Sequence, residues 1–175
     1  MSNIDSDPWF SRGQTLGVSS TSDGTHIVGT PKWFVDVHPR TGVVNSNAPV
    51  KCIAMRNTSG GAILPGAAVK AKASALLSEV DGSAGVNDMV VGIADEYLPA
   101  AGVANNDIFW VVVEGPTTAT TAATFAAADL ISFTGGAAVA AVANKTAGIA
   151  LAATASGKVR VLVGLAGRSA RVSSP

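Results

Sequence analysis

Short runs in which apolar and polar side chains alternate, separated by turn-forming residues, occupy the chain from residue 49 onward. Residues 158–163 place a valine at every second position, and residues 50–56 divide into two faces in the same way. A period of two is typical of a β-strand, because successive side chains point to opposite faces. Residues 108–113 (IFWVVV) are apolar on both faces, which predicts a strand buried on both sides. We expect strands at 50–56, 69–73, 90–94, 108–114 and 158–163, and therefore an all-β fold.

Turn-forming residues mark the connections between these runs. The Asn and Gly residues at 57–61 tolerate a positive φ, and Pro65-Gly66 fits the central pair of a type II turn. Gly135-Gly136 and Ser156-Gly157 are typical of β-hairpins. Residues 117–155 are ambiguous, because alanine favours helices whereas threonine favours strands. There we expect a short helical turn at 122–129, followed by strands of small residues at 130–133, 137–143 and 147–152.

Residues 1–49 differ from the rest, since Ser, Thr, Asn, Asp, Gly and Pro dominate and no helical period is present. This stretch nevertheless holds four of the nine aromatic residues of the chain, namely Trp9, Phe10, Trp33 and Phe34. Disordered tails are poor in aromatics, whereas an arm that docks on another surface needs large, rigid anchors. We therefore predict an extended N-terminal arm over 1–49, anchored by these four side chains. The alternative interpretation is an aromatic cluster that folds back on the chain's own domain.

The length and composition limit the possible classes of protein. The 175 residues suffice for one domain with a sizeable core. Charged residues make up 14% of the chain and the formal net charge is zero, which argues against a nucleic-acid-binding protein. No apolar run reaches about 18 residues, so we expect no transmembrane helix. The polar, acidic residues 1–8 are unlike a secretory signal, and the single cysteine, Cys52, excludes an intrachain disulfide.

Charge is segregated along the chain. Residues 73–144 hold eight acidic and no basic residues, whereas residues 145–175 hold five basic and no acidic ones. Two interpretations are open at this point. The segments can form complementary patches on neighbouring subunits, which would direct assembly, or they can interleave within one fold and neutralise each other.

No residues have the spacing of a catalytic or metal-binding set. The two histidines, His26 and His38, are not spaced as a helical ligand pair, and both are typical of turns or surfaces. Asp95 and Glu96 are adjacent, and we expect them to be turn or surface carboxylates, with salt bridging at an interface as the alternative. Cys52 has no histidine near it in the sequence and is expected to be a small core residue. We therefore expect no enzymatic activity, no cofactor and no metal ion.

Three stretches of the chain share a pattern with a known family. They are residues 54–69 (AMRNTSGGAILPGAAV), residues 91–116 with VGIADEYLPAAGV and DIFWVVVEGP, and residues 147–165 with AGIAL and KVRVLVGL. Together they resemble the small capsid cement, or decoration, proteins of tailed bacteriophages. The resemblance implies a β-barrel-like or jelly-roll-like domain over residues 50–166, between the arm at 1–49 and a C-terminal tail at 167–175.

The same resemblance implies a function. The chain would be a structural virion protein on the outer surface of an icosahedral capsid, which it stabilises by bridging major capsid protein subunits. Its partners would be the major capsid protein and copies of itself, as a homotrimer, with no nucleic acid and no membrane. It would be made in the cytoplasm of the bacterial host. The alternative is a surface-displayed recognition module for a host glycan or receptor, which exposed aromatics beside polar loops would indicate.

Overall fold

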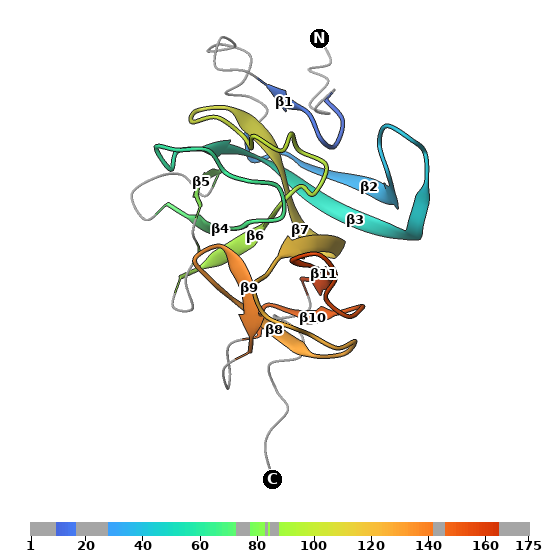
Figure 1. The fold of residues 1–175 in the computed structure, drawn as a ribbon. Helices are drawn as coiled ribbons and strands as arrows, with labels where there is room; N and C mark the ends of the chain where they lie inside the picture. Colours follow the sequence, from blue (N-terminus) through green and yellow to red (C-terminus); the bar gives the residue numbers. More distant parts are fainter. Residues whose placement is uncertain are drawn as a thin grey trace.

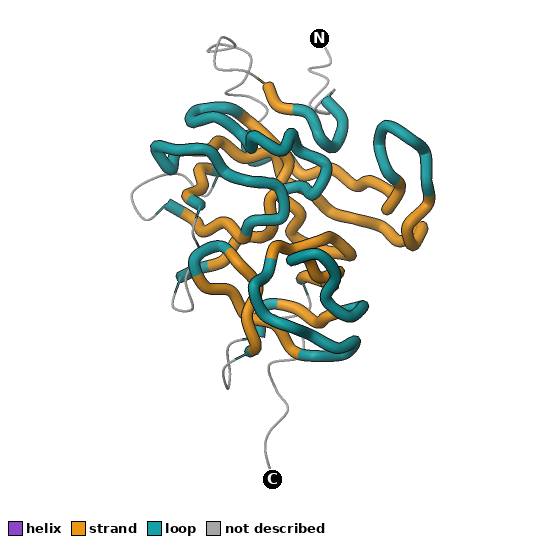
Figure 2. Tube along the Cα trace, in the orientation of Figure 1, coloured by secondary structure: helices purple, strands orange, loops and turns teal. Residues whose placement is uncertain are grey.

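A computed structural model describes residues 10–16, 28–72, 78–82, 84, 88–141 and 146–164, and every helix or strand among them is a β-strand (Figures 1 and 2). The prediction of an all-β fold is therefore confirmed. Each expected strand is present, with shifts at its ends. The strands are β1 (Thr15–Leu16), β2 (Pro31–Val37), β3 (Val44–Asn57), β4 (Ala68–Ala71), β5 (Glu79–Asp81), β6 (Val90–Ala94), β7 (Ile108–Thr120), β8 (Leu130–Thr134), β9 (Ala137–Ala140), β10 (Gly148–Ala150) and β11 (Lys158–Val163).

Five strands form a closed ring of paired neighbours. β3 pairs with β5, β5 with β4, β4 with β6, β6 with β7, and β7 again with β3. Of the two architectures that the resemblance implies, this ring corresponds to the small barrel. Each strand contributes an apolar side chain to one buried cluster, the barrel core, which contains Met55, Val69, Val80, Ala94 and Phe109. Burial of these side chains is the main favourable term that holds the ring together.

β7 continues from the barrel into a second sheet, ordered β7-β11-β10-β8-β9, whose orange and red strands lie at the bottom of Figure 1. The first half of β7 alternates between two cores. Phe109 and Val111 belong to the barrel core, whereas Trp110 and Val112 belong to a second core that reaches the second sheet. The prediction that this run is buried on both faces is therefore confirmed.

The aromatic-rich N-terminal stretch contributes strands to the same fold. β1 pairs with β7, and β2 pairs with β3, so that residues 31–57 form a hairpin. The boundary that we expected between residues 49 and 50 lies inside β3. The change in composition at this point misled the prediction, because residues 44–49 are largely exposed and are held as a strand by pairing with β2 rather than by a core. The tail at 167–175 lies outside the described residues.

Residues 122–129 form a loop in place of the expected helical turn. Side chains supply hydrogen bonds that compete with a helix. The Asp129 carboxylate accepts from the backbone N–H of Ala126 at 2.7 Å, and the Thr154 hydroxyl accepts from that of Phe125 at 2.9 Å. Phe125 is itself buried in the second core. Burial of the Phe125 ring, together with the two side-chain hydrogen bonds, therefore outweighs the helix propensity of the alanines.

The expected turns are present. Gly66 has a φ of 77°, and the N–H of Ala67 donates to the carbonyl of Leu64 at 3.2 Å, which closes the Pro65-Gly66 turn. Ser156 and Gly157, just before β11, both have positive φ values, as a two-residue type I′ turn requires. Gly135 and Gly136 connect β8 to β9.

Charges that are separate in the sequence meet in the fold. Arg12, from the N-terminal part, pairs with Asp95 at 2.8 Å, and Arg160, from the basic C-terminal part, pairs with Glu96 at 2.7 Å. Both carboxylates belong to the acidic segment 73–144. For these pairs, neutralisation within one fold is the correct interpretation. The structure also corrects the expectation for Asp95, which is fully buried and is not a surface carboxylate.

Candidate binding surface

The β2–β3 hairpin projects from the barrel as a two-stranded ribbon, at the right of Figure 1. The alternation along β2 turns Phe34 and Asp36 inward and Trp33 and Val35 outward. Four apolar side chains of the hairpin are between 51% and 59% exposed. These four, which we call the hairpin patch, are Trp33, Val35, Val43 and Val44.

The hairpin patch is unusual for a surface that faces only water. Scattered exposed apolar residues are common, whereas four of them on one projecting hairpin favour a contact with another molecule. Among the described strands, β2 pairs only with β3. An isolated two-stranded ribbon is only marginally stable in water. The patch therefore has the character of a protein-contact surface.

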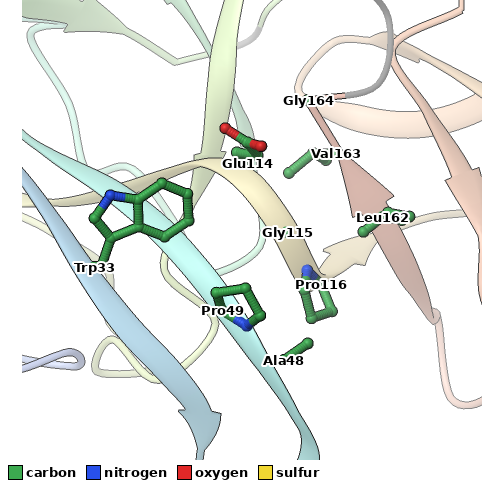
Figure 3. Close-up of a pocket in the computed structure, with 9 residues that line it drawn as sticks. All are labelled: Trp33, Ala48, Pro49, Glu114, Gly115, Pro116, Leu162, Val163 and Gly164. Carbon is green, nitrogen blue, oxygen red and sulfur yellow. The ribbon is translucent and has the colours of Figure 1, made fainter. Parts of the chain in front are cut away.

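A groove of about 320 Å³, which we call the Trp33 groove, begins at the patch and crosses β3, β7 and β11. Along β7, pairing with β3 ends at Glu114 and pairing with β11 begins at the next residue, and the groove lies where the two pairings meet. Figure 3 shows Trp33 on one side of the groove and Leu162 on the other, with Pro49 and Pro116 between them. Its volume falls at the lower end of the range of about 300–1,000 Å³ that is common for ligand sites.

Two glycines allow the strands to meet at this groove. Gly115 has a φ of 103°, and a Cβ atom there would lie 2.5 Å from the carbonyl oxygen of Pro49. Gly164 has a φ of 86°, and a Cβ atom there would lie 2.9 Å from the Cα atom of Glu114. Any other residue would be strained at both positions and would push the strands apart. The shape of the groove therefore depends on both glycines.

Two charged side chains lie beside Trp33. Lys51 is its cross-strand neighbour on β3, and the Lys51 ammonium lies 5.7 Å from the centroid of the Trp33 ring. Glu114 follows on β7, in register with Lys51. Directly opposite residues of adjacent strands share a face, so Trp33, Lys51 and Glu114 line one face of the sheet. The exposed Glu114 side chain makes no hydrogen bond or ion pair with the described part of the chain.

An ionic network ties the hairpin to the rest of the molecule. Arg160 of β11 binds both Asp36 of β2 and Glu96 of the β6–β7 connection. The Ser46 hydroxyl of β3 also donates a hydrogen bond to Asp36. Burial acts to raise the pKa of Asp36, but the hydrogen bonds from Arg160 and Ser46 outweigh it, so that this pKa lies below its ordinary value. The network fixes the hairpin against β11.

The structure separates the aromatic residues that were predicted to act as anchors. Phe10 is 1% exposed and stacks on Trp110 with ring centroids 4.4 Å apart, so the prediction is wrong for Phe10, which has no surface to offer a partner. Phe34 meets the edge of the same Trp110 ring at 5.2 Å and is half-buried. For these two, the alternative of a cluster on the chain's own domain is correct. Trp33 is 55% exposed, and Trp9 lies outside the described residues.

A buried ion pair that the sequence did not predict holds the N-terminal segment in place. The side chains of Arg12 and Asp95 are 2% and 0% exposed. The Arg12 guanidinium donates to one carboxylate oxygen of Asp95 at 2.8 and 3.1 Å, and the N–H of Gly13 donates to the other at 2.6 Å. The partners are 83 positions apart. A pairing over this distance leaves no local signal in the sequence.

The remaining residues that the sequence singled out have structural positions. Cys52 is buried in the second core, as expected, and burial raises the pKa of its thiol to about 12. The Nδ1 atom of His38 accepts from the N–H groups of Arg40 and Thr41, both at 3.2 Å, in the turn between β2 and β3. His26 lies outside the described residues.

The described part of the chain shows neither a grouping of metal ligands nor a membrane-spanning helix. Within the described ranges, no three His, Cys, Asp or Glu side chains are grouped as metal ligands would be. The same ranges contain no helix of the length and hydropathy needed to span a membrane.

Comparison with known protein families and with curated proteins finds no match. Among solved structures, the chain is similar to the N base of the head fiber gp8.5 of bacteriophage phi29, with a TM-score of 0.46 and 13% identity over 64% of this chain and 92% of that chain. It is also similar to a chain of the capsid of the Myoviridae phage XM1, with a TM-score of 0.47 and 16% identity over 74% of this chain and 96% of that chain.

Proposed function

We propose that this chain is a structural virion protein that binds the outer surface of an icosahedral phage capsid and bridges major capsid protein subunits. The hairpin patch carries the proposal, because it presents four exposed apolar side chains on a ribbon that projects from a rigid barrel. The sequence resemblance over residues 50–166 supplies the identity of the partner. Arg160, which binds Asp36 of the hairpin, holds the patch in a fixed orientation before contact.

A protein of this kind acts by binding and needs no chemical step. It stabilises the shell because it binds assembled subunits and not separated ones, and the effect grows with its free concentration relative to Kd. Trp33 is the largest exposed side chain of the patch, and large aromatics at the centre of an interface contribute most of the affinity. In this proposal the chain has no catalytic activity, cofactor or metal.

The proposal includes a homotrimer at local three-fold positions of the shell. With 14% charged residues, the chain has too little charge to cover its surface at ordinary density. Leu130 and Leu151, at the second sheet, are 52% and 43% exposed and offer an apolar contact between copies. The segregated charge supports the trimer less than the sequence suggested, because Asp95 and Glu96 are paired within the chain.

One observation favours the alternative of a recognition module for a host glycan. Trp33 is an exposed aromatic residue, as expected for such a module, although its polar neighbour in the groove is Glu114 of strand β7 and not a polar loop. The face of an indole ring can stack on the apolar face of a sugar, and a carboxylate can accept hydrogen bonds from its hydroxyl groups. Binding assays with capsids and with neutral glycosides distinguish the two functions.

The test is co-sedimentation of the full chain with capsids assembled without it. We expect saturable binding, and we expect Trp33→Ala to weaken it by about 2 kcal/mol or more, roughly 30-fold in Kd. Leu64→Ala is the matched control, because Leu64 is 52% exposed but lies outside the hairpin. If the unaltered chain does not bind, the proposed function is wrong. If Leu64→Ala weakens binding as much as Trp33→Ala, the assignment of the contact to the hairpin patch is wrong.

A further inference from the structure

Glu114 differs from the other carboxylates near the hairpin. Asp36, Glu96 and Asp95 are each bound by an arginine of this chain. Glu114 is exposed at the mouth of an otherwise mostly apolar groove and makes no ion pair with any described side chain. Its charge is therefore free to select a cationic partner.

The surroundings of Glu114 suit one kind of cation. Trp33 offers an aromatic ring, which attracts a cation to its face, and the exposed Pro49 and the half-buried Leu162 offer apolar surface to a hydrocarbon stem. An arginine side chain has all three complementary parts. Its guanidinium is planar, stacks on aromatic rings and binds a carboxylate through two parallel hydrogen bonds, whereas the lysine ammonium is a compact and strongly hydrated charge.

The same three-part arrangement occurs inside this protein. The guanidinium of Arg12 lies 4.7 Å from the centroid of the Tyr97 ring and is hydrogen-bonded to the Asp95 carboxylate at 2.8 Å. In the Trp33 groove the equivalent ring and carboxylate flank Lys51, whose ammonium lies 5.7 Å from the ring centroid, and no arginine among the described residues lines the groove. The arrangement at Arg12 shows that this chain already stabilises a guanidinium between an aromatic ring and a carboxylate.

We infer that the Trp33 groove binds an arginine side chain of the capsid subunit, with the guanidinium between the Trp33 ring and the Glu114 carboxylate. This inference rests on the proposed function and names the chemistry that the partner presents. Lys51 lies close to both groups and repels a second cation, so it lowers the affinity of the site. The site therefore accepts one arginine, and binding is weak unless the rest of the hairpin patch is also engaged.

The first experiment uses the free, full-length protein and acetyl-arginine amide as the probe. We expect saturable shifts of the Trp33 indole resonance in NMR spectra. Glu114→Gln should weaken binding about tenfold or more, and Lys51→Met should strengthen it. Asp88→Asn is the matched control, because it removes one surface carboxylate elsewhere and should leave the affinity unchanged. Equal binding of acetyl-lysine amide, binding of a neutral methyl glycoside in preference to the arginine probe, or no shift at Trp33 would overturn the inference.

The second experiment repeats capsid co-sedimentation with Glu114→Gln and Asp88→Asn, after their melting temperatures are compared with that of the unaltered chain. We expect about a tenfold loss of capsid affinity for Glu114→Gln alone. If the unaltered chain binds capsids and Glu114→Gln binds equally well, the inference is wrong and the proposed function stands. If acetyl-arginine amide binds through Glu114 but capsids do not bind, the proposed function is wrong and the arginine belongs to another partner.

Discussion

Replacing Phe10 by alanine tests directly whether the N-terminal segment belongs to the fold. The Phe10 ring is 1% exposed and stacks on Trp110 with an angle of 13° between the two ring planes. The backbone of the same residue is also engaged, since the Trp110 indole N–H donates to the carbonyl oxygen of Phe10 at 3.1 Å. Truncation to alanine keeps this hydrogen bond and removes the ring, so it isolates the packing contribution.

The expected loss follows from these contacts. Replacing a buried phenylalanine by alanine lowers the free energy of unfolding by about 3–5 kcal/mol. The stacked aromatic pair accounts for roughly 0.5–1.5 kcal/mol of this, beyond the burial of apolar area. For a domain of this size each kcal/mol lowers the melting temperature by roughly 3 °C, so we expect a decrease on the order of 10 °C.

The assay is equilibrium unfolding of the full chain in urea, followed by tryptophan fluorescence and by circular dichroism. Phe10→Leu is the first control and should recover most of the stability, because it refills the site with apolar volume. Ser11→Ala, at an exposed neighbouring position, is the second control and should change little. An alanine variant at position 10 that unfolds like the unaltered chain would show that residues 10–16 are a separate arm. By the same reasoning, deletion of residues 1–40 should unfold the domain, because it removes Phe10 and the whole of β2.

Three further predictions concern the hairpin, the groove and the core. Because the pKa of Asp36 is lowered in the folded state, this group stabilises the fold above the ordinary pKa of an aspartate, and the stability is lost as the pH falls through the folded-state pKa. The free energy of unfolding should therefore depend less on pH in the acid range for Asp36→Asn than for the unaltered chain. Parallel curves for the two proteins would contradict the role of the network. Gly115→Ala should lower the free energy of unfolding in urea by about 2 kcal/mol or more. Gly60 also has a positive φ, but no atom lies within 4 Å of an added Cβ, so Gly60→Ala should lower it by only about 1 kcal/mol. Cys52, with a thiol pKa of about 12, should not react with an alkylating reagent at pH 8 until urea unfolds the chain, and rapid labelling of the native protein would be inconsistent with its burial.

Much of the fold could be predicted from local pattern. The period of two in residues 158–163 and the doubly apolar run that starts at residue 108 each specify a strand and its burial, because both signals depend on side chains a few positions apart. The closure of the barrel could not be predicted in this way. It depends on β5, which has three residues and pairs in parallel with β3. So short a strand exists only because its neighbours on both sides supply hydrogen bonds.

The packing of the N-terminal aromatic residues could be predicted only in part, for a similar physical reason. Composition indicated that the aromatics before residue 50 needed a surface to pack on, but it could not specify which surface. Phe10 and Phe34 pack on Trp110, about 100 and 76 positions further along the chain, whereas Trp33 faces outward on the opposite side of β2. Glu114 was missed as a binding residue. A signal was present, since this acidic residue ends an apolar strand and precedes Gly115 and Pro116, but only the structure places it beside Trp33.

The most direct test of the account is a density map, obtained by electron cryo-microscopy, of capsids decorated with this chain. We expect density for the barrel on the outer surface, with the hairpin lying against capsid subunits and the Trp33 side chain buried in the contact. Three copies should surround each occupied three-fold position. Density in which the hairpin points to solvent and another face of the barrel contacts the shell would contradict the central claim, as would capsids that carry no density for this chain at saturating concentration.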